Sequence, residues 1–258
     1  PDAILVIDPD GEVRLANSNL PVSLDFDRVY QIHYLLAEKG KAMESKWGHS
    51  MFRVIICAPG KPLGPDCMRD ISRHIAISYR ANVSGLTLSY LAGFFGGYPS
   101  QLFLYTMPEI VNEYTLGESR NLRSVPIKMS RDEIRQFIFR ALDQYWGYQG
   151  DYYFLWNNCA TETLDFLRGS MIESPRVQKT KYTVVTPAKI YSALKKLDLL
   201  DESVLAGPEA QGRYFFRSFS DQVEAAFNTI KSMQGAPAKL SLDEYLYTYP
   251  SSKRRELY

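Results

Sequence analysis

Two stretches near the N-terminus have different hydrophobic patterns. Residues 2–7, DAILVI, are a short apolar run followed by the turn sequence DPDG, which predicts a strand. In residues 28–43, RVYQIHYLLAEKGKAM, the apolar side chains of Val29, Ile32 and Leu35 recur at helical spacing. We therefore expect a short strand followed by an amphipathic helix.

Two later segments alternate between polar and apolar residues. Residues 49–58, HSMFRVIICA, and 73–81, RHIAISYRA, are rich in β-forming residues, and the Pro- and Gly-rich residues 58–66 between them favour a turn. This pattern predicts an antiparallel hairpin with a long loop. Because strand side chains alternate, the second strand should present Ile75, Ile77 and Tyr79 on one face and His74, Ala76 and Ser78 on the other.

The pattern changes towards helices further along the chain. Ser130 and Glu133 form a capping box that opens a helix over residues 131–146. A second helix should begin near Cys159, with Asn157 or Asn158 as its N-cap. The remaining elements that we expect are a helix or loop over 86–95, a turn at 96–99, a strand over 124–130, and helices over 186–200, 222–234 and 242–249.

Composition excludes few functions. The chain has 258 residues, 45% of them hydrophobic, which is enough for a sizeable core. The formal net charge of +1 gives no electrostatic reason to expect a nucleic-acid partner. No apolar run reaches the roughly 18 residues that a membrane-spanning helix needs. The 18 tyrosines and 13 phenylalanines suit either an aromatic core or an apolar cleft, interface or lipid contact.

The three cysteines carry more information. Cys57 and Cys67 flank the predicted turn, so they form either a disulfide, as in an oxidising compartment, or two reduced thiols. The odd count leaves Cys159 as the unpaired thiol. At a helix start, the backbone N–H groups and the helix dipole can stabilise both a thiolate and a developing oxyanion. Cys159 is therefore a candidate nucleophile.

A nucleophilic cysteine needs a base, and the chain has three histidines. His33 falls within the first predicted helix, where a surface or core role is expected. His49 opens a predicted strand in the sequence WGHS and is the candidate base. His74 lies on the polar face of the next strand and could orient the imidazole ring of His49, with Ser78 as the fallback. The Cys and His spacing matches no zinc motif, and no phosphate-binding loop is present, so we expect no metal ion or cofactor.

Several separated motifs within residues 45–170 resemble one bacterial envelope family, which includes the Lnb-type lipoprotein N-acyltransferases. They are WGHSMFRV, LAGFFGGYPSQL, EIVNEYTLGESRNL and DYYFLWNNCATETLDFL. The order of a strand histidine, a polar residue on the next strand and a cysteine at a helix start also resembles circularly permuted papain-like enzymes. Those include the NlpC-like and lecithin:retinol acyltransferase-like groups.

This resemblance implies a fold and a domain organisation. The fold would be α+β and permuted papain-like (NlpC-like), with an antiparallel sheet packed against the helix that bears the nucleophilic cysteine, and with extra helices. Residues 1–171 would form the catalytic core, with an N-terminal strand and helix, and residues 172–258 a helical extension. The location would be the periplasm or cell envelope, in association with the membrane.

The resemblance also implies an activity and a set of site residues. A Cys159–His49 dyad would transfer an acyl chain through a thioester, with phospholipids and lipoproteins as substrates at the membrane surface. His74 stands where relatives carry a different polar residue, a departure from the family pattern at the orienting position. Side chains expected to bind substrate, with Glu118 and Arg120 contacting a headgroup or an amine, are Tyr98, Glu118, Arg120 and Asn158.

Two other functions fit the same residues. A hydrolase of the NlpC-like type would use the Cys/His pair to cut cell-wall peptides, with water in place of an amine as the acceptor. A non-catalytic envelope module would bind lipid without turning it over. Two of the motifs also have purely structural explanations. The glycines of FFGGYP fit a tight turn, and Glu118 and Arg120 can form a structural ion pair.

Overall fold

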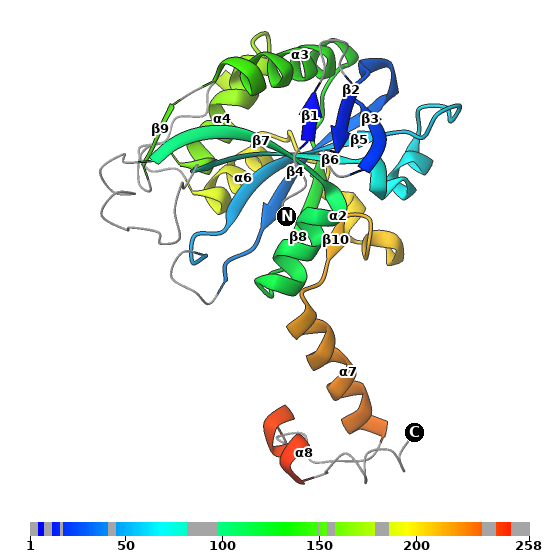
Figure 1. The fold of residues 1–258 in the computed structure, drawn as a ribbon. Coiled ribbons are helices and arrows are strands. Elements are labelled where there is room, and N and C mark those ends of the chain that lie inside the picture. The colour runs from blue at the N-terminus through cyan, green and yellow to red at the C-terminus, as the bar shows by residue number, and fades with distance from the viewer. Residues whose placement is uncertain are drawn as a thin grey trace.

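A seven-stranded antiparallel sheet forms the centre of the computed structural model, in the order β10-β8-β4-β5-β6-β7-β9 (Figure 1). Residues 5–7, 12–15, 18–40, 45–81, 98–148, 150–153, 158–178, 186–233 and 241–248 are described by the structure. The strands of the large sheet are β4 (Val29–Ala37), β5 (His49–Ile56), β6 (Ile75–Ala81), β7 (Tyr98–Thr106), β8 (Leu122–Pro126), β9 (Gly150–Tyr152) and β10 (Phe215–Phe216). A separate three-stranded sheet contains β1 (Leu5–Ile7), β2 (Glu12–Leu15) and β3 (Ser18–Ser23).

The expected helix over residues 28–43 is wrong, because the structure has strand β4 over most of this segment. β4 lies in the interior of the sheet between β8 and β5 and is buried on both faces. Ile32 and Tyr34 enter the hydrophobic core on one side, and Leu35 enters the core on the other. A strand buried on both faces is apolar at nearly every position, and such a run also matches helical spacing.

The predicted hairpin is confirmed. β5 and β6 pair antiparallel, with Phe52 opposite Ile77 and Arg53 opposite Ala76. Ile75, Ile77 and Tyr79 enter one core cluster, whereas Ala76 enters the other, as alternation requires. The short strand near the N-terminus is also found as β1.

The helices begin where capping residues predict. Ser130 and Glu133 form the expected capping box at the start of α3 (Arg131–Gly147), and Asn158 caps α4 (Cys159–Ser170). The strand expected over 124–130 is β8, which ends at Pro126. The segment 86–95 lies outside the described residues. The other helices are α2 (Met107–Val111), α5 (Pro175–Gln178), α6 (Pro187–Lys196), α7 (Phe219–Met233) and α8 (Leu242–Thr248).

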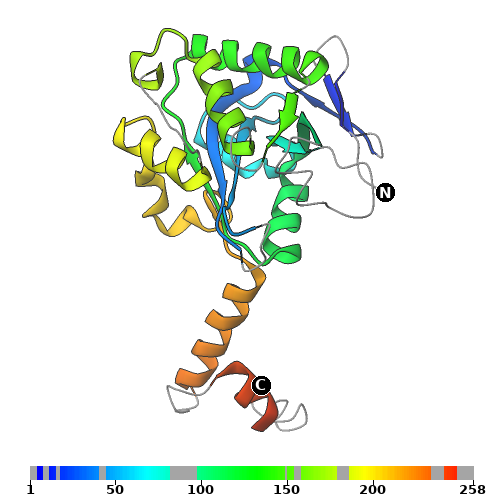
Figure 2. The ribbon, with the colours of Figure 1, turned by 90° about the vertical axis from the view of Figure 1, so that its left-hand side faces the viewer.

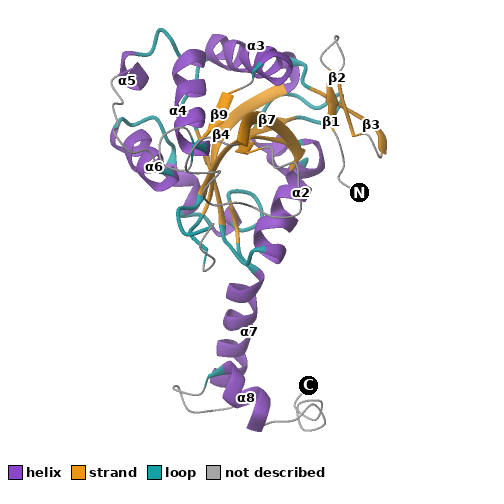
Figure 3. Ribbon diagram, turned by 60° about the vertical axis from the view of Figure 1, so that its left-hand side comes forward, coloured by secondary structure: helices purple, strands orange, loops and turns teal. Residues whose placement is uncertain are grey.

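Helices cover the large sheet unequally. α3, α4 and α6 lie against one face, and α2 lies on the other (Figure 3). The larger core joins Phe52 of β5 to Phe137 of α3, Phe166 of α4 and Ile190 of α6. The helix α7 projects from this body and carries α8 near its far end (Figure 2). The chain is thus an α+β protein, and its predicted division between residues 171 and 172 stays a prediction.

Candidate functional site

Cys159 is the first residue of α4. The side-chain oxygen of Asn158 accepts hydrogen bonds from the backbone N–H groups of Ala160 and Thr161 at 2.9 and 3.2 Å, and so caps the helix. Cys159 is a free cysteine and only 6% exposed. The prediction of an unpaired thiol at the start of a capped helix is confirmed, while a substrate-binding role of Asn158 stays a prediction.

The environment of the thiol favours its protonated form. Burial raises the pKa of the Cys159 thiol above its ordinary value, and hydrogen bonds with Ser50, Tyr152 and the Ala160 backbone oppose that rise. The helix start favours the thiolate, but burial has the larger effect. In the resting structure the sulfur is therefore a thiol, and a base is needed to remove its proton.

The helix α4 packs on β5 at the point where this strand begins. Ser50 Oγ donates a hydrogen bond to Thr163 Oγ1 at 3.2 Å, and Thr163 Oγ1 donates one to the Cys159 carbonyl at 2.6 Å. Ser50 directly follows His49, so the contact of Cys159 with β5 is one residue away from the predicted base. Neighbouring strand residues point to opposite faces of a sheet, so Ser50 faces α4 and His49 faces the pocket described below.

His49 is held by contacts on that second face. Its Nε2 lies 2.8 Å from Ser78 Oγ, and its ring stacks on Tyr114 with the ring centroids 6.1 Å apart. Burial of the ring lowers the pKa of His49 well below its ordinary value, and the charges of Arg80 and Arg120 lower it further. The imidazole is therefore neutral at neutral pH, with a lone pair on one ring nitrogen.

Tyr152, in the edge strand β9, is a neighbour of the thiol. Burial raises the pKa of its hydroxyl, and the neighbouring Cys159 and Tyr114 add to this rise. The same hydroxyl forms a hydrogen bond with Cys159, and Tyr114 is the ring that stacks on His49. Tyr152 is thus a neighbour of the thiol, and Tyr114 is a neighbour of the imidazole.

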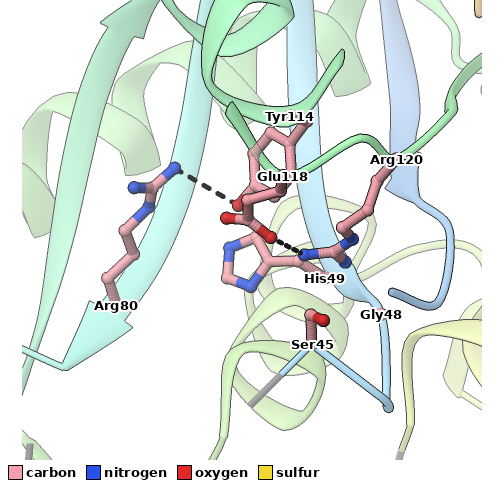
Figure 4. Close-up of a pocket in the computed structure, with 7 residues that line it drawn as sticks. All are labelled: Ser45, Gly48, His49, Arg80, Tyr114, Glu118 and Arg120. Atoms are coloured by element: carbon pink, nitrogen blue, oxygen red, sulfur yellow. Dashed lines mark hydrogen bonds and ion pairs between the residues drawn. The ribbon is translucent and has the colours of Figure 1, made fainter. Parts of the chain in front are cut away.

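A pocket of about 190 Å³ opens beside His49 (Figure 4). Arg120 is 4% exposed there and donates a hydrogen bond to Glu118 at 2.6 Å. Ser119 between them has a φ angle of 50°, a left-handed conformation that is uncommon for serine. The lining residues come from the turn before β5, from β5 and β6, and from the π-helical segment and loop after α2: Ser45, Gly48, His49, Arg80, Tyr114, Glu118 and Arg120.

The structure does not bring His74 to His49. His74 Nδ1 accepts hydrogen bonds from Arg53, the shorter at 2.7 Å, and His74 Nε2 lies 2.9 Å from the Cys67 carbonyl oxygen. Both ring nitrogens are therefore occupied within a buried network. The orienting contact expected of His74 is wrong, and Ser78, the fallback residue, makes it instead.

His33 lies in the same buried network and not on a helix. It is fully buried in β4, opposite Arg53 of β5, and its Nδ1 lies 2.9 Å from Ser124 Oγ. The core role expected of His33 is confirmed, although its element is a strand. Tyr98 begins β7 and pairs with Tyr152 of β9, and its substrate-binding role stays a prediction.

Sequence reasoning missed Arg80 and Tyr114. Arg80 Nε donates to Ser78 Oγ at 3.2 Å, and its guanidinium forms two hydrogen bonds with the Glu113 carboxylate at 2.9 and 3.1 Å. Alternation along β6 carries a signal for Arg80, since it follows Ser78 by two residues on the polar face. Tyr114 lies on the π-helical segment Asn112–Gly117. No periodicity in the sequence predicts this segment.

The two remaining cysteines are joined. Cys57, just beyond the end of β5, and Cys67 form a disulfide, so the disulfide alternative is correct and the reduced alternative is wrong. Disulfides persist in oxidising compartments such as the bacterial periplasm. Within the described residues, no helix has the length and apolar character that crossing a membrane requires.

The fold and the site together define a class of protein. It is an α+β protein with a seven-stranded antiparallel sheet, a disulfide, a free cysteine at a helix start, and a pocket that His49 helps to line. The family model described as the Lnb N-terminal periplasmic domain matches residues 18–196, more than half of the chain, and the chain belongs to this family. The expected membership of a bacterial envelope family of Lnb type is confirmed, and the family is periplasmic. No curated protein and no solved structure matches the chain.

Proposed function

We propose that the protein is a thiol acyltransferase of the bacterial envelope, with Cys159 as the nucleophile and His49 as the base. The observation that carries the proposal is the position of Cys159, a free buried thiol at the capped start of α4, in contact with the strand residue that follows His49. A helix on the sheet with cysteine as its first residue also supports a permuted papain-like fold.

The hydrogen bonds of His49 suit a base. Ser78 holds Nε2 at 2.8 Å, and an orienting partner on one ring nitrogen assigns the other nitrogen, Nδ1, to the proton of the nucleophile. In this tautomer Nε2–H donates to Ser78 Oγ, and Nδ1 carries the free lone pair. His49 is the first residue of β5, after Gly48, so its side chain stands at the end of the sheet.

The reaction has two steps. The proposal requires the thiol and the imidazole, which approach β5 from opposite faces, to meet at the first residue of this strand. There His49 Nδ1 removes the thiol proton, and the Cys159 sulfur attacks an ester carbonyl of a phospholipid or diacylglyceryl group. The backbone N–H groups at the start of α4 stabilise the oxyanion. The C–O bond breaks, the alcohol leaves with the proton from His49, and a thioester remains. The α-amino group of a lipoprotein then attacks the thioester, an amide forms, and the thiol is restored.

The experiment combines the purified protein with phospholipid and a synthetic diacylglyceryl lipopeptide at a membrane surface. Mass spectrometry of the lipopeptide should show an added N-linked acyl chain or a shift of an acyl chain to the amine. Trapping at short times should show an acyl mass on the peptide that contains Cys159, removable by hydroxylamine. Cys159→Ala should lose all turnover, and His49→Ala should lose roughly 10²–10⁴-fold.

The controls separate this proposal from its rivals. Cys159→Ala removes a single sulfur atom and should keep the thermal unfolding midpoint of the parent within a few degrees. The turnover of His49→Ala is compared at a temperature at which its own unfolding curve shows it to be folded. Full turnover in Cys159→Ala would remove the proposal. Release of free fatty acid or of cell-wall peptides, without amide formation, would assign a hydrolase, and binding without turnover would assign a lipid-binding module.

A further inference from the structure

Two neighbouring pockets meet at Gly48. We call the pocket beside His49 the arginine pocket, after Arg80 and Arg120, and the second one the tryptophan pocket, after Trp47. The tryptophan pocket has a volume of about 320 Å³. It is lined by Leu36, Ala37, Glu38, Lys39, Trp47, Gly48 and Ala188. Gly48 lines both pockets, so the two are adjacent at this residue.

A side chain would not fit at this junction. Gly48 has a φ angle of 82°, a conformation that favours glycine. A Cβ atom there would lie 2.9 Å from the Ala37 carbonyl oxygen and 3.7 Å from Pro187 Cβ. Glycine at this position therefore leaves the junction of the two pockets free of a side chain.

Two arginines line the arginine pocket, each paired with a glutamate, Arg80 with Glu113 and Arg120 with Glu118. Arg120 is held in place by the carbonyls of Glu38 and Ala37, which accept its hydrogen bonds at 2.6 and 3.2 Å. Arg80 projects from β6 on the other side of the pocket (Figure 4). Both charges act on the His49 ring between them and lower its pKa. Guanidinium groups around a cavity can bind phosphate through their paired N–H donors.

Glu118 is the group that a bound anion would replace. Its side chain is 38% exposed and forms an ion pair with Arg120. Swinging this carboxylate into water would free the Arg120 N–H groups for a ligand. The partner of Arg80, Glu113, has two hydrogen bonds to the guanidinium and would stay in place.

The tryptophan pocket has the opposite character. Its walls are mainly apolar, and the indole of Trp47 is 62% exposed at its edge. Tryptophan at such a position suits contact with hydrocarbon near a lipid–water interface. The same lining also contains one charge of each sign, Glu38 and Lys39.

We propose that the two pockets together bind one anionic amphiphile, with its phosphate between Arg80 and Arg120 and its alkyl chain along Trp47. This inference deepens the function proposed above, and it rests on that function for the idea that the amphiphile is an acyl donor. Binding itself requires no turnover.

The test uses the Cys159→Ala variant, in which binding is separated from catalysis, with three soluble probes below their aggregation concentrations. They are octyl phosphate, inorganic phosphate and the neutral octyl glucoside. Calorimetry gives the affinities, and tryptophan fluorescence reports on the indole, with Trp47→Phe identifying the signal of Trp47. Octyl phosphate should bind at least tenfold more tightly than either other probe, and each methylene added to the chain should increase affinity by up to about fourfold.

Charge variants give the decisive comparison. Glu118→Gln, which removes one partly exposed carboxylate, should strengthen octyl phosphate binding severalfold, and Arg80→Gln should weaken it at least tenfold. Tighter binding of octylammonium than of octyl phosphate, with loss of it in Glu118→Gln, would overturn the proposal in favour of an amine site. Equal binding of inorganic phosphate and octyl phosphate would reduce the site to a free-anion site and also overturn it.

Failure here and failure of the proposed function are distinguishable. If octyl phosphate does not bind while the parent protein transfers acyl chains, this inference falls and the thiol chemistry stands. If octyl phosphate binds as described and the parent protein transfers nothing, the amphiphile site stands and the acyltransferase proposal falls.

Discussion

The large sheet contains two clusters in which a serine joins a histidine to an arginine. In the sealed cluster, Ser124 Oγ lies 2.9 Å from His33 Nδ1 and accepts a hydrogen bond from Arg53 at 3.2 Å. In the open cluster, Ser78 Oγ lies 2.8 Å from His49 Nε2 and accepts a hydrogen bond from Arg80 at 3.2 Å. The residue types and distances are nearly the same.

The surroundings of the two clusters differ. The sealed cluster also contains His74, and the side chains of Arg53, His33, His74 and Ser124 are fully buried. The open cluster faces a cavity of about 190 Å³. Buried polar groups that satisfy one another stabilise a fold, whereas the same groups beside a cavity can act on a ligand. Access, and not residue type, separates the structural histidines from the candidate catalytic one.

The largest effect that would test this comparison concerns Arg53. Its guanidinium donates to His74, to Ser124 and to the Arg213 carbonyl, the last at 2.6 Å. Arg53→Met should lower the free energy of unfolding by about 3 kcal/mol, because it leaves these buried acceptors without a donor. Urea unfolding measures the loss. Arg69→Met, at a side chain that is 63% exposed, is the matched control and should change stability by no more than about 0.5 kcal/mol.

A smaller effect should appear when the pH is lowered. Burial is the main cause that lowers the pKa of His33, His49 and His74 in the folded protein, that of His74 to about 3. The unfolded chain binds protons at these residues below its ordinary pKa of about 6.5, and the folded chain does not. Stability is therefore fully present above pH 6.5 and falls as the pH decreases towards 3.

Each histidine should contribute about 1.4 kcal/mol per pH unit to this slope once the pH is well below 6.5. Urea unfolding between pH 7.5 and 5.5 measures the slope before most carboxylates titrate. His74→Gln should reduce this slope by up to about 1.4 kcal/mol per pH unit, which is the contribution of one proton. A stability that does not change over this range would show that the sealed histidines accept protons without unfolding, and the comparison would lose its basis.

The smallest expected effects come from substituting the serine of each cluster, Ser78 in the open one and Ser124 in the sealed one. Ser78→Ala should lower the turnover number by about tenfold, as loss of an orienting partner does in other sites, with little change in stability. Ser124→Ala should lower the free energy of unfolding by about 1–2 kcal/mol and leave turnover unchanged. Kinetics and urea unfolding of both variants test this pair. Equal effects of the two variants on turnover would contradict a division between a sealed and an open cluster.

Local signals in the sequence were sufficient for part of the fold. The hairpin of β5 and β6 could be predicted because only one face of β6 is rich in large apolar residues, so that alternation is visible. The starts of α3 and α4 could be predicted because capping is a local interaction between Ser130 and Glu133, and between Asn158 and its own helix. The position of Cys159 at a helix start follows from the same rule.

The errors have a common physical cause. β4 is buried on both faces, so its apolar run has no strand-like alternation, and His33 was placed on a helix in consequence. The partners of His49 are set by tertiary packing, which brings Tyr114 and Arg120 from beyond β7 onto the sheet. His74 shares a face with Ser78, and only the pairing with Arg53 decides that His74 belongs to the sealed cluster. Such choices depend on contacts between distant segments.

The cross-link between Cys57 and Cys67 has a consequence for the maturation of the protein. Cys57 directly follows the strand that begins at His49. His74 Nε2 lies 2.9 Å from the Cys67 carbonyl oxygen. A chain made in a reducing cytoplasm would lack this disulfide, and the C-terminal end of β5 would be held less firmly. Export thus completes the scaffold of the site, so recombinant protein for these assays is best produced by secretion or with oxidative refolding.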